Sequence, residues 1–124
     1  MTLAVDVSAP SQAQQTPPGR ITPAEVASIA TVLGRDLPVA LDPVTTVVGV
    51  RAEGTQIVAN VQVSQPLAMA RRDAYVAAIQ RLGTQMLCGE ARAFAGFVRR
   101  GGSMRLVYTD VAGNVLEATV ATCL

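Results

Sequence analysis

Two β-hairpin patterns, separated by a long helical pattern, constrain this fold more than any other feature of the sequence. The first hairpin pairs the β-branched segment 44–51 with the alternating segment 55–63 across the short loop Ala52-Glu53-Gly54. The second pairs segments 104–108 and 115–121 across a turn that contains Asp and Gly, the residues that tight turns favour. Four strands in two hairpins are therefore expected.

Three helical patterns accompany the hairpins. The first begins with a capping box, in which Thr22 is the N-cap, Pro23 the first helical residue and Glu25 the third. A long helix is expected over residues 66–88, and a short one over residues 90–100. The long helix carries apolar residues at three- and four-residue spacing, which predict its packing face: Tyr75, Ile79, Leu82 and Met86.

The element order is therefore α-β-β-α-α-β-β, which predicts the α+β class. We expect an antiparallel sheet of two β-hairpins with helices packed on one face. A length of 124 residues suits one hydrophobic core, so residues 21–124 are expected to form a single domain. The order of the strands cannot be derived from these patterns.

Residues 1–20 show neither apolar period and are rich in Gln, Ser and Pro, so we expect a flexible leader. Within it, Ser11-Gln12-Ala13 has the small-x-small form of a signal-peptidase site. The segment is then interpreted as the remnant of an export signal, and the alternative is a native tail.

The composition excludes several classes of function. The chain has no histidine and no lysine, so the commonest general base, metal ligand and Schiff-base residue are all missing. A net charge of +1 lacks the positive excess that binding to nucleic acid requires. No stretch is long and apolar enough to span a bilayer. We expect no enzyme, no cofactor, no bound metal, no nucleic acid partner and no membrane span.

Cys88 and Cys123 are the only cysteines, and an even count in a small chain suggests one disulfide. Such a bridge would join the end of the long helix to the end of the last strand, and would stabilise the fold by roughly 3.5 to 4 kcal/mol in the chain-entropy model. The alternatives are two buried thiols or a redox pair, although a redox pair normally has Cys-x-x-Cys spacing. A disulfide indicates the periplasm or secretion.

Exposed arginines are the candidate partner-binding residues. Arg71 and Arg72 lie on the expected long helix near Tyr75, and Arg99 and Arg100 lie at the end of the short one. Together they would suit an acidic partner. The alternative is that each pair is solvated or serves a helix dipole.

The C-terminal third, from Cys88 through the segment 97–110 to Gly113 and Cys123, resembles small periplasmic proteins related to type II secretion pilotins, including quorum-sensing-regulated virulence factors. Those proteins share a cysteine after a long helix, a strand ending in Tyr-x-Asp, a glycine turn and a closing strand with the partner cysteine. The resemblance implies an exported α+β domain that binds a protein segment without catalysis. Pilotins are usually lipoproteins, whereas Cys88 lies inside the domain.

Three functions remain open. The leading hypothesis is a periplasmic or secreted adaptor that captures a peptide or helix in an apolar groove between the long helix and the sheet. The second is an inhibitor or immunity protein that blocks an enzyme through a loop such as Ala52-Glu53-Gly54. The third is a small hydrolase that relies on carboxylates such as Asp73 and Glu90. The oligomeric state is not indicated.

Overall fold

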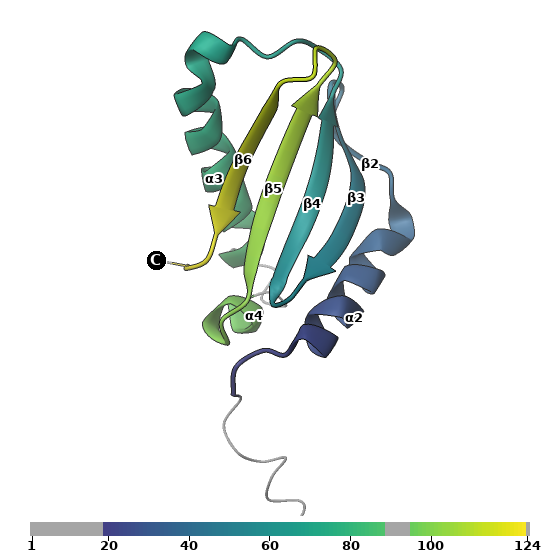
Figure 1. Ribbon diagram of the computed structural model, residues 1–124, viewed down its shortest axis with the longest axis vertical. Helices are drawn as coiled ribbons and strands as arrows, with labels where there is room; N and C mark the ends of the chain where they lie inside the picture. Colours follow the sequence, from purple (N-terminus) through teal and green to yellow (C-terminus); the bar gives the residue numbers. More distant parts are fainter. Residues whose placement is uncertain (1–18, 89–94, 124) are drawn as a thin grey trace, which may run out of the picture.

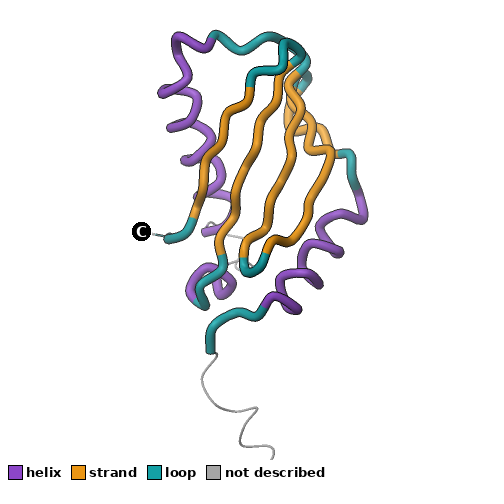
Figure 2. Tube along the Cα trace, in the orientation of Figure 1, coloured by secondary structure: helices purple, strands orange, loops and turns teal. Residues whose placement is uncertain are grey.

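The computed structural model describes residues 19–88 and 95–123. Five strands form one sheet, and the helices lie along it (Figures 1 and 2). In chain order the helices and turns of helix are α2 (Pro23–Leu33), the 3₁₀ turn η1 (Gly34–Asp36), the 3₁₀ turn η2 (Met69–Arg71), α3 (Arg72–Cys88) and α4 (Ala95–Arg99). The strands are β2 (Val39–Asp42), β3 (Thr45–Glu53), β4 (Gln56–Val63), β5 (Ser103–Asp110) and β6 (Val115–Val120).

The predicted capping box begins α2. The Thr22 hydroxyl accepts a hydrogen bond from the backbone N–H of Glu25 at 3.2 Å, and a Glu25 carboxylate oxygen accepts one from the Thr22 N–H at 3.1 Å. Two of the N–H groups that the helix start leaves unpaired are satisfied in this way. Gly34 forms the C-cap, so the sequence signals locate both ends of this helix.

The α+β class and the helix and strand layout are confirmed, but the sheet is mixed, not antiparallel throughout. Its order is β2-β3-β4-β5-β6, and β4 pairs with β5 in parallel, from Gln56 opposite Ser103 to Val63 opposite Asp110. The other pairs are antiparallel. The chain leaves β4 at one end of the sheet and returns along α3, so β5 starts where β4 started and must run parallel to it. The link between the hairpins is thus itself a strand–helix–strand unit.

Other boundaries also differ from the sequence patterns. The first hairpin turn contains only Gly54 and Thr55, because Ala52 and Glu53 continue β3 and Glu53 pairs with Gln56. Gly54 has φ +59°, a conformation that glycine adopts without a steric penalty. The helix expected over residues 90–100 appears as α4, and its proposed start falls outside the described residues, as does most of the leader over residues 1–20.

Residues 39–42 form a strand that the patterns did not predict. β2 pairs with β3 at the edge of the sheet, from Val39 opposite Val47 to Asp42 opposite Thr45. Prolines lie on both sides of it, at Pro38 and Pro43. Because they flank the strand rather than interrupt it, they are compatible with a short edge strand.

The core lies on one face of the sheet, where both long helices pack. Alternate residues of β4, β5 and β6 point into it: Ile57, Ala59, Val61, Val63, Met104, Leu106, Tyr108, Leu116, Ala118 and Val120. α2 packs chiefly against β3, and α3 chiefly against β6 (Figure 1). The two helices therefore stand at opposite sides of the same face. No helix among the described residues covers the other face of the sheet, which we call the open face.

The packing face of α3 is rotated relative to the predicted stripe. Ile79, Gly83 and Leu87 are its buried residues, whereas Leu82 and Met86 are about two-fifths exposed. A Cβ atom at position 83 would lie 2.7 Å from Cδ1 of Leu106. Because Gly83 has no side chain, α3 can approach the sheet closely with this residue facing it. Leu82 and Met86 then lie at the side of the helix, where they are partly exposed.

The predicted disulfide joins Cys88, the last residue of α3, to Cys123, which follows β6. Their Cα atoms are 5.5 Å apart, and 35 positions separate the two residues in the sequence. The Gln80 side-chain amide also donates a hydrogen bond to the Thr119 carbonyl at 3.1 Å. α3 is thus fastened to β6 by a covalent bond and by a polar contact.

Asp110 organises the turn between β5 and β6. Its buried carboxylate accepts hydrogen bonds from the backbone N–H groups of Ala112 and Asn114 and from the Asn114 side chain, and also from the N–H of Leu67 ahead of α3. The Leu67 N–H, with the Asn114 and Ala112 donors, lowers the pKa of Asp110 from 3.8 to about 2. The turn role expected for this residue is present, and it extends to the α3 connection.

Candidate functional site

An apolar groove lies between α2 and α3 on the helix-covered face of the sheet. Its volume is about 210 Å³. Its lining comes from α2, from the residue that follows η1, from all the strands except β6, and from α3. The lining residues are Leu33, Leu37, Val39, Leu41, Val47, Val50, Ala59, Val61, Leu82, Met86, Leu87, Met104, Leu106 and Tyr108. We call this feature the apolar groove. Every lining residue is hydrophobic.

The rim of the apolar groove is unusually exposed for residues of its type. Val39 and Leu41 of β2 are 40% and 41% exposed on one side, and Leu82 and Met86 of α3 are 40% and 42% exposed on the other. The floor is the buried sheet face. Four large apolar side chains therefore face solvent around one hollow, an arrangement typical of interaction sites.

The groove offers very little polar chemistry. Tyr108 carries the one side-chain polar group in its lining. Burial raises the pKa of that phenol, and the nearby negative charge of Asp42 adds to the rise, so the hydroxyl stays protonated at neutral pH. The groove can bind apolar side chains, but its lining supplies no nucleophile, base or metal ligand.

A larger hollow of about 560 Å³ lies at the end of the sheet where the β2–β3 and β5–β6 turns meet. Its lining mixes apolar and polar residues, including Gln62, Thr109 and Asp110. The Asp110 carboxylate is already engaged by its four hydrogen-bond donors. We therefore regard the apolar groove as the stronger candidate.

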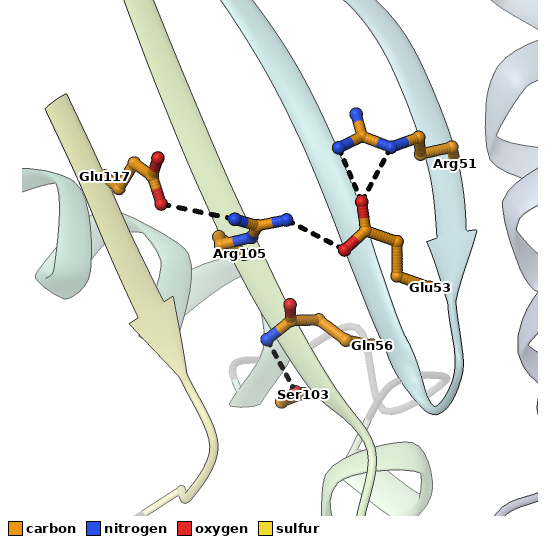
Figure 3. A network of polar contacts seen from close by, with 6 residues as sticks. All are labelled: Arg51, Glu53, Gln56, Ser103, Arg105 and Glu117. Atoms are coloured by element: carbon orange, nitrogen blue, oxygen red, sulfur yellow. Dashed lines mark hydrogen bonds and ion pairs between the residues drawn. The ribbon is translucent and has the colours of Figure 1, made fainter. Parts of the chain in front are cut away.

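The open face of the sheet carries a network of ion pairs (Figure 3). Glu117 contacts Arg105 at 3.4 Å, Arg105 contacts Glu53 at 2.9 Å, and Glu53 contacts Arg51 at 2.6 Å. The hydrogen bond from Arg51 is the main cause that lowers the pKa of Glu53. Gln56 and Ser103 lie beside these four residues and are joined by a hydrogen bond of 3.1 Å.

The candidate partner-binding arginines do not form one surface. Arg71 and Arg72 are exposed where α3 begins, whereas Arg99 and Arg100 belong to the end of α4 (Figure 1). α3 has 17 residues and is about 25 Å long, so it separates the two pairs. Tyr75 is half-buried and lines a different hollow with Leu67 and Leu116.

Arg100 has a structural contact. Its guanidinium donates to both carboxylate oxygens of Glu25, at 2.9 and 3.0 Å, and to the carbonyl of Gly19 at 2.9 Å. The hydrogen bonds from Arg100, together with those from Thr22, lower the pKa of Glu25 to about 2. Arg100 thus fastens the end of α4 to the start of α2, while Arg99 is exposed.

The wall formed by β2 was missed in the sequence. Val39 and Leu41 alternate with Ala40 and Asp42 between two prolines, and this apolar alternation was the available signal. A groove between the long helix and the sheet was expected, but not its second wall. Over residues 19–88 and 95–123, no three potential ligands gather to hold a metal ion, and no helix is long and apolar enough to cross a membrane.

Comparisons with known proteins support the fold. No family model matches the chain, and no curated protein matches its sequence. The structure is similar to a crystal structure from Pseudomonas aeruginosa, described as "a putative secreted protein", with a TM-score of 0.67 and 14% sequence identity. The match covers 79% of this chain and 87% of the other. At this identity the likeness establishes a shared α+β architecture.

Proposed function

We propose that this chain is an exported, non-enzymatic binding module that holds an amphipathic helix of a partner protein in the apolar groove. The role is that of an adaptor, as the pilotin resemblance suggests. The exposed apolar rim carries the proposal. A partner that covers the groove removes the rim residues from contact with water: Val39, Leu41, Leu82 and Met86. Burial of apolar surface favours association by ~25 cal/mol for each Å² removed from water.

A helix suits this groove better than an extended peptide. The lining is apolar throughout except for the Tyr108 hydroxyl, so it offers few partners to the backbone of an extended chain. Burial of unpaired peptide groups is costly. A helix satisfies its own backbone hydrogen bonds and can insert apolar side chains spaced three and four residues apart. Met86 adds an unbranched side chain that adapts to the inserted group.

Export is supported by two independent features. The disulfide between Cys88 and Cys123 is the kind of bond that persists in the periplasm or outside the cell. The protein of similar fold from Pseudomonas aeruginosa is described as "a putative secreted protein", and the description applies to that protein. A periplasmic or secreted location for this chain is consistent with both.

A binding role is also favoured by the state of the carboxylates. Glu25 and Asp110 are held ionised by arginine or by backbone donors, and Glu53 and Glu117 are ion-paired. The pKa values of Glu25, Glu53 and Asp110 are lowered, whereas acid catalysis at neutral pH requires a carboxyl group with a raised pKa. The ion pairs of Glu53 also leave the first hairpin turn without a free acidic side chain for an inhibitor contact.

The proposal is tested by selection from a displayed library of peptides against the 124-residue chain. Peptides with an apolar i, i+3 or i+4, i+7 pattern should be enriched. Their affinity should fall at least tenfold with Met86→Glu, because the new carboxylate would have to be buried beneath the bound helix.

The matched control is Val111→Glu, which places the same charge at an apolar position that is 65% exposed and outside the groove. It should leave the affinity unchanged. Enrichment of strand-like alternating peptides only, or equal binding by the Met86→Glu variant, would refute the proposal.

A further inference from the structure

The apolar groove adjoins a second hollow of about 290 Å³ on the same side of the sheet. Tyr108 lines both hollows, and α3 contributes Tyr75, Ala78 and Ile79 to the second one. We call the second one the tyrosine hollow. Ile79 lies about one helical turn before Leu82, which lines the apolar groove, so the two hollows follow each other along α3. A helix held in the groove would therefore meet Tyr108 where the hollows adjoin.

The side chain of Tyr108 carries a hydroxyl without a hydrogen-bond partner. The residue is 8% exposed. Burial and the charge of Asp42 raise its pKa, and no hydrogen bond from the described residues contributes. Within residues 19–88 and 95–123, the side-chain nitrogen or oxygen that is fully enclosed and unpaired is Nε of Arg105. The Tyr108 oxygen, also unpaired, is therefore not fully enclosed and remains accessible from the hollows that the residue lines.

A partner that covers the groove would enclose this hydroxyl. An enclosed hydroxyl that loses its bonds to water and gains no others weakens binding by roughly 5- to 150-fold. A wholly apolar helix would incur this penalty. The partner that binds best should therefore present one polar group to Tyr108.

Asp42 determines which kind of polar group is favoured. It follows Leu41, which lines the groove, and it pairs across the strands with Thr45, which lines the tyrosine hollow. Its side chain is exposed, and none of the ion pairs among the described residues includes it. Asp42 is also the one charged group that acts on the Tyr108 hydroxyl in this part of the chain. Its negative charge disfavours a carboxylate at this point and favours a cation.

A lysine or arginine side chain meets both requirements. Its apolar stem can lie against the hydrophobic lining while its charged head stays near solvent. The head can donate a hydrogen bond to the Tyr108 oxygen, which has lone pairs to accept it. The same head faces the carboxylate of Asp42. A neutral amide could bond to the hydroxyl but would leave the charge of Asp42 without a counterpart.

We propose that the helix held in the apolar groove carries one basic side chain within its apolar face, and that Tyr108 and Asp42 together select it. The inference rests on the proposed function and specifies the chemistry of the partner. Tyr108 supplies the hydrogen-bond acceptor, and Asp42 supplies the opposite charge.

The test uses displayed helical peptides with leucine on the apolar face, in which one position of that face at a time is randomised. Selection against the 124-residue chain should enrich lysine or arginine at one position. A synthetic peptide with the enriched residue is compared with the same peptide carrying methionine there, an unbranched apolar side chain. The basic peptide should bind about tenfold more tightly at low salt, as a charge-assisted hydrogen bond predicts. The advantage should shrink in about 1 M NaCl.

Two variants separate the two contributions. Tyr108→Phe removes the hydroxyl and keeps the ring, and Asp42→Asn removes the charge and keeps an oxygen for the Val44 N–H that Asp42 binds at 2.9 Å. Each should remove most of the advantage of the basic peptide. Tyr108→Phe should also strengthen binding of the methionine peptide, because no unpaired hydroxyl is then enclosed.

The matched control is Asp73→Asn, the same change at an exposed carboxylate that lines neither hollow. It should preserve the advantage, and circular dichroism establishes that each variant is folded. Enrichment of apolar or acidic residues at every randomised position, or an advantage that both variants leave intact, would overturn the inference. The groove itself would then still stand if Met86→Glu weakened binding of both peptides alike. Failure to select any peptide would overturn both proposals.

Discussion

Removal of the disulfide should cost this fold a large part of its stability. The bridge closes a loop of 35 residues between Cys88 and Cys123. In the chain-entropy model, closing a loop of that length removes entropy from the unfolded chain and raises the free energy of unfolding by about 3.8 kcal/mol at 25 °C. A small domain is stable by roughly 5 to 15 kcal/mol in total, so the clamp contributes a substantial fraction.

The perturbation is the double variant Cys88→Ser and Cys123→Ser, unfolded in urea and followed by circular dichroism. The free energy of unfolding falls by about 1 to 3 kcal/mol for each M of urea. The lost stability should therefore lower the urea concentration at the unfolding midpoint by roughly 1.3 to 3.8 M. Reductant should produce a similar shift in the wild-type chain and none in the double variant. Intact mass after alkylation should show two labels only after reduction.

A midpoint shift below about 0.5 M with an unchanged slope would refute the entropic reasoning, because the bridge would then not restrict the unfolded chain as the loop length requires. Labelling of both sulfurs without reductant would refute the bridge itself.

Two further predictions concern packing and acid stability. Gly83→Ala should destabilise the fold by about 1 to 2 kcal/mol, because overpacking against Leu106 costs more than the ~1 kcal/mol gained in helix propensity. Urea unfolding measures this loss. The control is Gln85→Ala on the exposed side of α3, which should leave the free energy of unfolding nearly unchanged. The lowered pKa of Asp110 means that its ionised form contributes stability above pH 4 and that this contribution is lost as the pH falls towards about 2. Asp110→Asn should therefore flatten the decline in unfolding free energy between pH 4 and pH 2, and an unchanged slope would contradict the assignment.

Signals that act over a few residues were reliable guides to this fold. The capping box at Thr22 and Glu25, and the turn function of Asp110, follow from hydrogen bonds within four positions of the chain. The end of the long helix and most strand boundaries follow from apolar periodicity, whereas the helix starts at Arg72 and not at residue 66 as expected. The two cysteines were paired by elimination, since the chain has no others.

The candidate site was predictable only in part. A groove beside the long helix was expected, yet its second wall is β2, whose short alternating pattern lies between prolines. The arginines chosen as candidates were chosen for charge alone, and nothing local shows that Arg100 pairs with Glu25, which is 75 positions away.

By itself, the sequence indicated the α-helices and every strand except β2, where several of them end, and that two sulfurs are available for one bridge. Tertiary structure alone decided that β4 and β5 run parallel, that Gly83 turns Leu82 and Met86 towards the groove, and that four charges form a network on the open face. The reason is physical. Periodicity and caps depend on neighbours along the chain, whereas strand order, helix rotation and ion pairing depend on which distant segments the packed layers bring together.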